Sequence, residues 1–305
     1  MMELTNKAQP AARIRVGVAG WYYPDWQGIV YPSSGRGASD HLRYLAGFVD
    51  VIEINNTFYR PPDENDVLNW LRRVRDIEGF GFTVKLWQRF THSREERWQP
   101  SELEDFLRRI RPIFESDVGG ALLAQFPHSF HLTPENLEYL HELVSRIENI
   151  PVVVEVRHFS WNNPEAFAAL EEMGVSLCAI DQPLFRGSLK PLERVVGDTA
   201  YIRLHGRNKQ NWLKESADRD ERYDYLYTEA ELAPWVARAK KMAGKAHSVY
   251  VIANNHFRGQ AVCNALMFKA ALLGRRVRAP ATVLQSFPVL KAHASPDAPM
   301  QEMLF

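Results

Sequence analysis

The chain has 305 residues, of which 46% are hydrophobic and 24% are charged, a composition typical of globular proteins of enzyme size. Lys plus Arg and Asp plus Glu number 37 each, so no overall field directs the protein toward nucleic acid or a membrane surface. Two cysteines, no apolar leader and no apolar run long enough to span a bilayer predict a cytoplasmic protein without disulfides or membrane contact.

Short apolar runs recur along the chain with mostly amphipathic stretches between them, a pattern that predicts parallel strands joined by helices. The runs are 14–20, 49–55, 80–86, 120–126, 151–157, 175–181, 199–206 and 248–255. This number of strand–helix units favours a single-domain TIM-type (β/α)8 barrel over an open doubly wound sheet, because no glycine-rich dinucleotide loop follows an early strand. We expect an N-terminal extension at 1–13, the barrel at 14–290 and a flexible tail at 291–305.

Residue types at the starts of several helices indicate where the helices begin. Ser101–Glu104 and Thr228–Glu231 have the spacing of capping boxes, while Thr133 and Asn163 each precede a proline as a capping residue would. Between 181 and 199 the helical pattern is short, so we expect an irregular sixth unit.

The stretch VVVEVRH at 152–158 combines a buried strand with two charges. Residues at alternate positions leave the same face of a strand, so Glu155 and Arg157 point to one side. The same alternation opposes Glu53, Lys85 and Arg203 to aliphatic residues of their strands. Because the aliphatic face packs on the helices, the charged face points toward the barrel axis, near the C-terminal ends where barrel active sites lie.

Other polar and aromatic residues end these strands or begin the loops that follow, and we predict that they complete one pocket. They are Trp21, Asn55, Tyr59, Gln125, Asp181, His205, Arg207, Asn254 or Asn255, and His256. A structural ion pair would explain any single Glu–Arg combination. Polar ends on so many strands instead indicate a functional pocket, because each buried charge needs compensation.

The residue types suggest an enzyme that binds a small anionic or phosphate-containing substrate. Lys85, Arg157, Arg203 and Arg207 would hold the anion, since arginine suits bidentate binding of carboxylate or phosphate. The catalytic candidates are Glu53, Glu155, Asp181 and His205, with a glutamate as general base and His205 as acid or base.

A divalent metal is the competing interpretation, and no other cofactor is indicated. Glu155, Asp181 and His205 end successive strands and offer oxygen and nitrogen ligands. Arginines on the same strands oppose a nearby cation. A metal-dependent sugar isomerase is therefore kept as an alternative.

Several longer motifs occur together between about Val16 and Leu273: GWYYPDW with the following YP, EINNTFYRPP, FTVKLWQRFTH, LLAQFP, VEVRHFSW, YIRLHGRN and NNHFRGQA. Their order resembles the YecE-like family, domain of unknown function 72. The resemblance implies a TIM barrel, in agreement with the strand pattern, and implies no established reaction.

The chain ends in QEMLF, which resembles the short peptide with which bacterial replication and repair proteins bind the DNA sliding clamp. In that pattern Gln301 makes polar contacts, while Leu304 and Phe305 fill an apolar groove. A chance match, or packing of Leu304 and Phe305 on the barrel, are the alternatives.

These observations favour an enzyme, either a phosphoester hydrolase or an isomerase, whose substrate is a nucleic-acid end, an abasic site or a phosphosugar. The alternative is a non-catalytic nucleotide- or DNA-binding module that its tail brings to the clamp.

Overall fold

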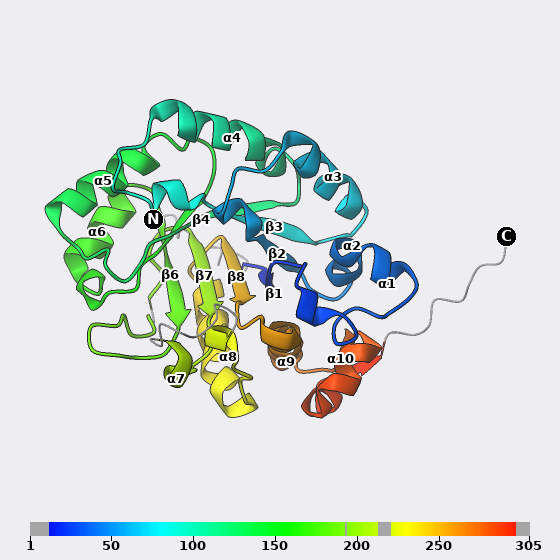
Figure 1. Cartoon of the computed structure of the whole chain (residues 1–305). Helices are drawn as coiled ribbons and strands as arrows, with labels where there is room; N and C mark the ends of the chain where they lie inside the picture. Colours follow the sequence, from blue (N-terminus) through cyan, green and yellow to red (C-terminus); the bar gives the residue numbers. More distant parts are fainter. Residues whose placement is uncertain (1–11, 193, 213–220, 297–305) are drawn as a thin grey trace, which may run out of the picture.

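The structure is a computed structural model that describes residues 12–192, 194–212 and 221–296. Eight parallel strands pair in chain order and close into a barrel, with β8 hydrogen-bonded to β1 (Figure 1). The strands are β1 (Ile14–Ala19), β2 (Val51–Ile54), β3 (Gly81–Lys85), β4 (Gly119–Gln125), β5 (Val152–Glu155), β6 (Ser176–Asp181), β7 (Thr199–Leu204) and β8 (Ser248–Ala253). Each lies in one of the predicted apolar runs, except that β4 begins one residue earlier, at Gly119, and the predicted TIM-type barrel is confirmed.

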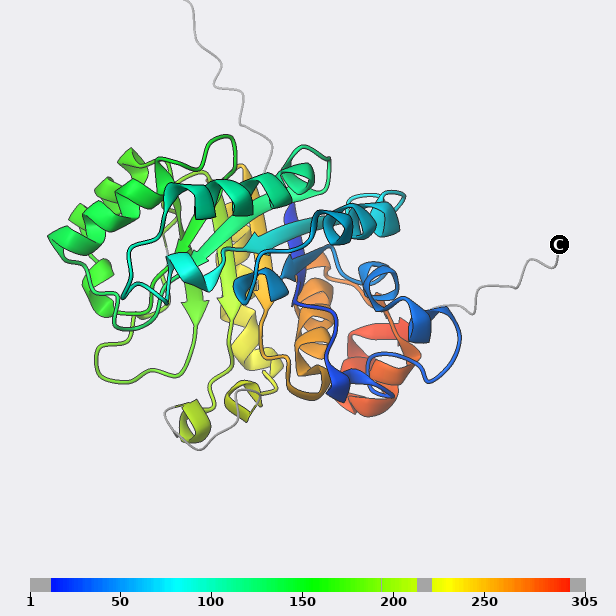
Figure 2. The same cartoon turned by 45° about the horizontal axis from the view of Figure 1, so that its top comes forward.

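Helices cover the outside of the barrel (Figure 2). The α-helices that the described residues form up to residue 273 are α1 (Arg36–Ser39), α2 (His41–Ala46), α3 (Glu64–Val74), α4 (Pro100–Phe114), α5 (Pro134–Val144), α6 (Pro164–Glu172), α7 (Lys209–Trp212), α8 (Glu229–Ala243) and α9 (Gln260–Leu273). Of these, α7 lies in the loop after β7, where the ring of its Trp212 is 6.3 Å from that of His205. The described residues between β6 and β7 form no helix, not even the short one that the pattern suggested, so the expected irregularity of the sixth unit is confirmed. The described helices include none long and apolar enough to cross a membrane.

The predicted starts of three helices are confirmed by their caps. The Thr133 hydroxyl accepts from the backbone of Asn136, Asn163 caps α6 in the same way, and Thr228 begins a capping box. The capping box expected at Ser101–Glu104 is wrong. Pro100 occupies the first turn of α4, and the Glu102 carboxylate accepts from the backbone N–H of Gln99, so the box lies two residues earlier.

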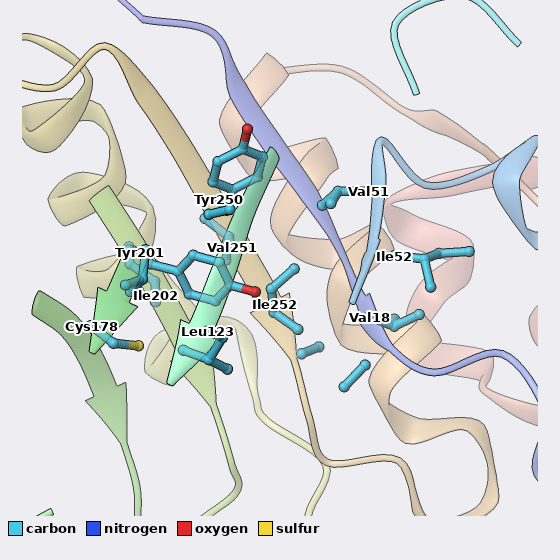
Figure 3. Close-up of a cluster of buried hydrophobic side chains, with 14 of the residues drawn as sticks. Val18, Val51, Ile52, Leu123, Cys178, Tyr201, Ile202, Tyr250, Val251 and Ile252 are labelled. Atoms are coloured by element: carbon cyan, nitrogen blue, oxygen red, sulfur yellow. The ribbon is translucent and has the colours of Figure 1, made fainter. Parts of the chain in front are cut away.

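Buried apolar side chains hold the barrel together in one continuous core. Between strands and helices lie the aliphatic faces that the alternation predicts, including Ile52, Val154 and Ile202, all fully buried. Figure 3 shows part of the core, where side chains from β1, β2, β4, β6, β7 and β8 gather. Tyr201 belongs to this cluster, and its ring packs tilted against that of Tyr250.

The chain continues past the barrel into a small appendage. Strand β9 (Val277–Ala279) pairs in parallel with β10 (Ala294–Pro296), and α10 (Ala281–Ser286) lies between them in sequence. Leu290 and Ala294 are fully buried. Strand β10 therefore lies beyond residue 290, where the sequence analysis placed the end of the barrel. Gln301, Leu304 and Phe305 lie outside the described residues.

Candidate functional site

A buried ion network crosses the barrel interior. Arg203 on β7 donates from Nη2 to Glu53 Oε1 on β2 and from Nη1 to Glu155 Oε2 on β5, each over 2.7 Å. All of these side chains are at most 1% exposed. Burial alone would raise the pKa of Glu155, but the charge of Arg203 outweighs it, so this pKa is well below its ordinary value. The alternation of the strands thus correctly places these three side chains on the inward face of the barrel.

Tyr201 and Thr83 extend the network away from the strand ends. The Tyr201 hydroxyl donates to Glu53 Oε2 over 2.9 Å and lies 2.7 Å from the Thr83 hydroxyl. Our sequence interpretation missed Tyr201. The signal was present, because Tyr201 stands two residues before Arg203 and therefore on the same face of β7.

Arg157 and His205 form a second layer on Glu155. Arg157 Nη2 donates to Glu155 Oε1 over 2.9 Å, and His205 Nε2 lies 3.1 Å from the same oxygen. The amide nitrogen of Asn254 is 3.0 Å from His205 Nδ1, which can accept only when unprotonated. This arrangement places the ring proton on Nε2, facing Glu155. Burial lowers the pKa of His205 to about 3, so the ring is neutral near neutral pH.

A cavity of about 490 Å³ opens at the C-terminal ends of the strands. It brings together many of the predicted residues: Trp21, Asn55, Tyr59, Lys85, Gln125, Arg203, Asn254 and His256. Glu53, Glu155, Arg157 and His205 are not among the described residues that line it. They support the wall through Arg203 and Asn254, the two residues that belong to both the wall and the network.

Aromatic rings form the rim of this pocket. Trp21 packs edge-on against Trp70, with 5.5 Å between the ring centres. Tyr23 stacks on His256 at 4.5 Å, and Tyr223 lies 5.0 Å from the same ring. Trp70 and Tyr223 come from a helix and a loop, so the alternation of strands carried no signal for them.

Lys85 ends β3 with its side chain in the pocket wall. Its Nζ lies 3.9 Å from the centre of the Phe58 ring. Within the described residues Lys85 Nζ makes no hydrogen bond or ion pair. Burial, followed by repulsion from Arg203, lowers the pKa of Lys85 to about 7.

Asp181, Arg207 and Asn255 were expected in the pocket, but the structure places them outside it. Ile180 pairs with the inward-facing Arg203, so Asp181 faces the other side of β6. There its carboxylate accepts from Arg207 Nε over 2.9 Å. The sixth strand is apolar on both faces, which is why its sequence did not reveal this orientation.

The turn after β7 explains where Arg207 points. Gly206 has φ +91°, a conformation that side-chain-bearing residues rarely adopt, and its N–H donates to the Tyr227 hydroxyl over 2.8 Å. This turn leaves His205 inside the barrel and sends Arg207 toward Asp181 and Glu231.

Asn254 and Asn255 point in different directions at the end of β8. Asn254 lines the pocket and contacts His205. Asn255 is fully buried behind the wall, where its amide donates to the Tyr225 carbonyl and to Asn264 Oδ1. The two alternatives that the sequence left open are thereby separated, with Asn254 as the pocket residue.

The expected metal ligands do not converge. Glu155 and His205 meet inside the barrel, while Asp181 lies on the opposite side of its strand, paired with Arg207. Among the described residues, no three His, Cys, Asp or Glu side chains are grouped so that they could hold a metal ion. The guanidinium of Arg157 beside Glu155 further opposes a cation there.

Fold and site together define a (β/α)8-barrel protein with a polar, aromatic-rimmed pocket above a buried ion network. The chain belongs to the family described as "Protein of unknown function DUF72", which matches residues 15–286. This confirms the resemblance that the sequence motifs indicated.

Relatives from three bacteria support the assignment. The chain is 29% identical over 266 residues to the UPF0759 protein YunF of Bacillus subtilis (strain 168), covering 82% of this chain and 92% of that protein. A DUF72 family crystal structure from Thermotoga maritima MSB8 is 33% identical, with a TM-score of 0.77 over 85% of this chain and 99% of that one. Another, from Enterococcus faecalis V583, is 25% identical, with a TM-score of 0.73 over 86% and 96%.

Proposed function

We propose that this protein is an enzyme that acts on a small hydroxylated carbonyl compound, a sugar or sugar phosphate, in the pocket at the strand ends. The observation that carries the proposal is a pocket wall with unsatisfied polar groups. Asn55 Oδ1 and Arg203 Nε are buried atoms of wall residues, and neither has a hydrogen-bond partner within the described residues. Buried polar groups are nearly always hydrogen-bonded, so these atoms favour a polar ligand.

The rim supports the same class of ligand. Trp21, Tyr59 and Tyr223 surround the opening, and aromatic faces bind the apolar C–H face of a sugar ring. Amide side chains of Asn55, Gln125 and Asn254 can both donate to and accept from hydroxyl groups. A volume of about 490 Å³ is in the range of small-molecule sites.

The charges of the site favour carbonyl chemistry over phosphoester hydrolysis. Arg157, Arg203 and Arg207, which the sequence assigned to an anion, are each paired with a carboxylate. Support for a phosphate group therefore comes from Lys85 alone. With its pKa near 7, Lys85 also supplies an unprotonated amine for proton abstraction beside a carbonyl. A perturbed titratable group in a pocket is a mark of catalysis, which favours an enzyme over a binding module.

Ligand binding tests the proposal through the tryptophan fluorescence of the rim. Aldoses, ketoses, their monophosphates and the corresponding sugar alcohols would be titrated into wild-type protein and the Asn55→Ala variant. We expect at least one compound to bind and the variant to bind it about tenfold more weakly, the loss of one hydrogen bond. The exposed Asn162→Ala variant is the matched control. Failure of the whole panel, or equal affinity of Asn55→Ala and wild type, would refute the proposal.

A further inference from the structure

We propose that Lys85 is a covalent catalyst whose Nζ forms an imine with the aldehyde or ketone carbon of the substrate. This inference rests on the proposed function, because it needs a carbonyl compound in the pocket. It goes further by naming the nucleophile and the bond that forms.

The position of Lys85 suits a nucleophile. The residue ends β3, where the backbone is fixed by pairing with β2 and β4, and only 8% of it is exposed. Its backbone carbonyl accepts from the buried Thr57 hydroxyl over 2.6 Å, which anchors the end of β3 to the turn that follows β2. The Phe58 ring lies against one side of the ammonium, so a ligand approaches from the pocket.

The environment of Lys85 differs from that of other lysines in the chain. Lys269 donates to Asp50 over 2.7 Å, so the positive charge of its ammonium is paired with a carboxylate. Lys240 is exposed on α8. Lys85 instead lies in the pocket wall, and its Nζ makes no hydrogen bond or ion pair within the described part of the chain. Exposed lysines carry a strongly hydrated ammonium, whereas burial of Lys85 favours the neutral amine, whose nitrogen lone pair is available.

Electrostatics support the same assignment. Burial and Arg203 lower the pKa of Lys85 to about 7, whereas an ordinary lysine has a pKa of 10.5. Near pH 7 the unprotonated fraction therefore exceeds that of an ordinary lysine by roughly a thousandfold. Glu53 and Glu155 act in the opposite direction and favour a positive charge at this nitrogen, which the protonated imine carries.

The reaction balances without an oxidant or a further reactant. The Nζ lone pair attacks the carbonyl carbon, and one Nζ proton passes to the former carbonyl oxygen, which gives a neutral carbinolamine. A second proton, taken from solvent, lets this oxygen leave as water while the C=N bond forms and leaves the imine protonated. The protonated imine then withdraws electrons from the neighbouring carbon, which eases loss of a proton or cleavage of a C–C bond there.

Trapping with a reductant tests the proposal on the full chain. D-glyceraldehyde and sodium cyanoborohydride would be added near neutral pH, and modified peptides quantified by mass spectrometry. Cyanoborohydride reduces an imine to a stable secondary amine. We expect Lys85 to be modified at least a hundredfold faster than exposed Lys240 in the same sample. The rate at Lys85 should rise with pH and level off above about pH 7 to 8. Modification of Lys85 no faster than Lys240 would overturn the proposal.

Two further measurements separate this proposal from the proposed function. Sugar alcohols lack the carbonyl and bind without forming an imine, so their affinity reports on the pocket alone. If they bind while Lys85 stays unmodified, the imine is refuted and the sugar site survives. If neither occurs, both proposals fail. In Lys85→Met, circular dichroism would establish folding, and the fast phase of adduct formation measured on intact protein should be lost; its persistence would refute Lys85 as the nucleophile.

Discussion

Replacing Arg203 by methionine tests whether the buried network is held together by this one guanidinium. The change removes two charge-assisted hydrogen bonds of 2.7 Å, to Glu53 and to Glu155. Glu155 retains Arg157 and His205, but Glu53 retains only the Tyr201 hydroxyl as a hydrogen-bond partner within the described residues. An uncompensated buried charge of this kind costs about 3–5 kcal/mol.

Urea unfolding of Arg203→Met, followed by circular dichroism near neutral pH, should show a free energy of unfolding about 3–5 kcal/mol below wild type. The double variant Glu53→Gln/Arg203→Met is the informative partner, because the amide needs no counter-charge and still accepts from Tyr201. We expect it to recover about 2 kcal/mol relative to the single variant. A loss below about 1 kcal/mol for Arg203→Met, or strict additivity in the double variant, would refute this account of the network.

Three further predictions follow from individual residues. The folded-state pKa of His205, about 3, lies below the ordinary histidine value of 6.5, so unfolded chains bind a proton that folded chains do not, and stability falls as pH drops between these values. In urea titrations His205→Gln should remove up to about 1.4 kcal/mol per pH unit of this slope; an unchanged slope would contradict a neutral His205. Asp181→Asn should lower stability by about 1 kcal/mol, because its partner Arg207 is partly exposed, and leave sugar affinity unchanged; weakened binding would return Asp181 to the site. The sequence prediction that QEMLF binds the sliding clamp requires that purified clamp retain the full chain, but not a chain without residues 301–305, in a pull-down; any other result would exclude QEMLF as the docking peptide.

The fold was predictable because its signals are local and repeated. Each strand of the barrel is a run of β-branched and aliphatic residues, and the caps at Thr133, Asn163 and Thr228 mark helix starts by their own chemistry. Alternation also placed Glu53, Glu155 and Arg203 correctly, because each shares a strand with a clear aliphatic face.

The pairing of the charges was not predictable in the same way. Alternation states which side of a strand a residue faces, but the distance from Arg203 to Glu53 depends on closure of the whole barrel. The sequence therefore suggested that Arg157 and Arg203 could bind an anion, whereas in the structure both are paired with Glu155. The prediction for Asp181 was wrong for a different reason. Its strand is apolar on both faces, so alternation could not show which face points into the barrel.

The ion network determines by which route a ligand can enter and leave the pocket. Arg203 spans the barrel from β7 to β2 and β5, with Tyr201 and Thr83 continuing the packed layer below. The network thus closes the base of the pocket, so a compound that enters past the aromatic rim leaves by the same opening. Under the proposed function, product would have to leave before the next substrate binds, past Tyr59 and Tyr223, which line the pocket.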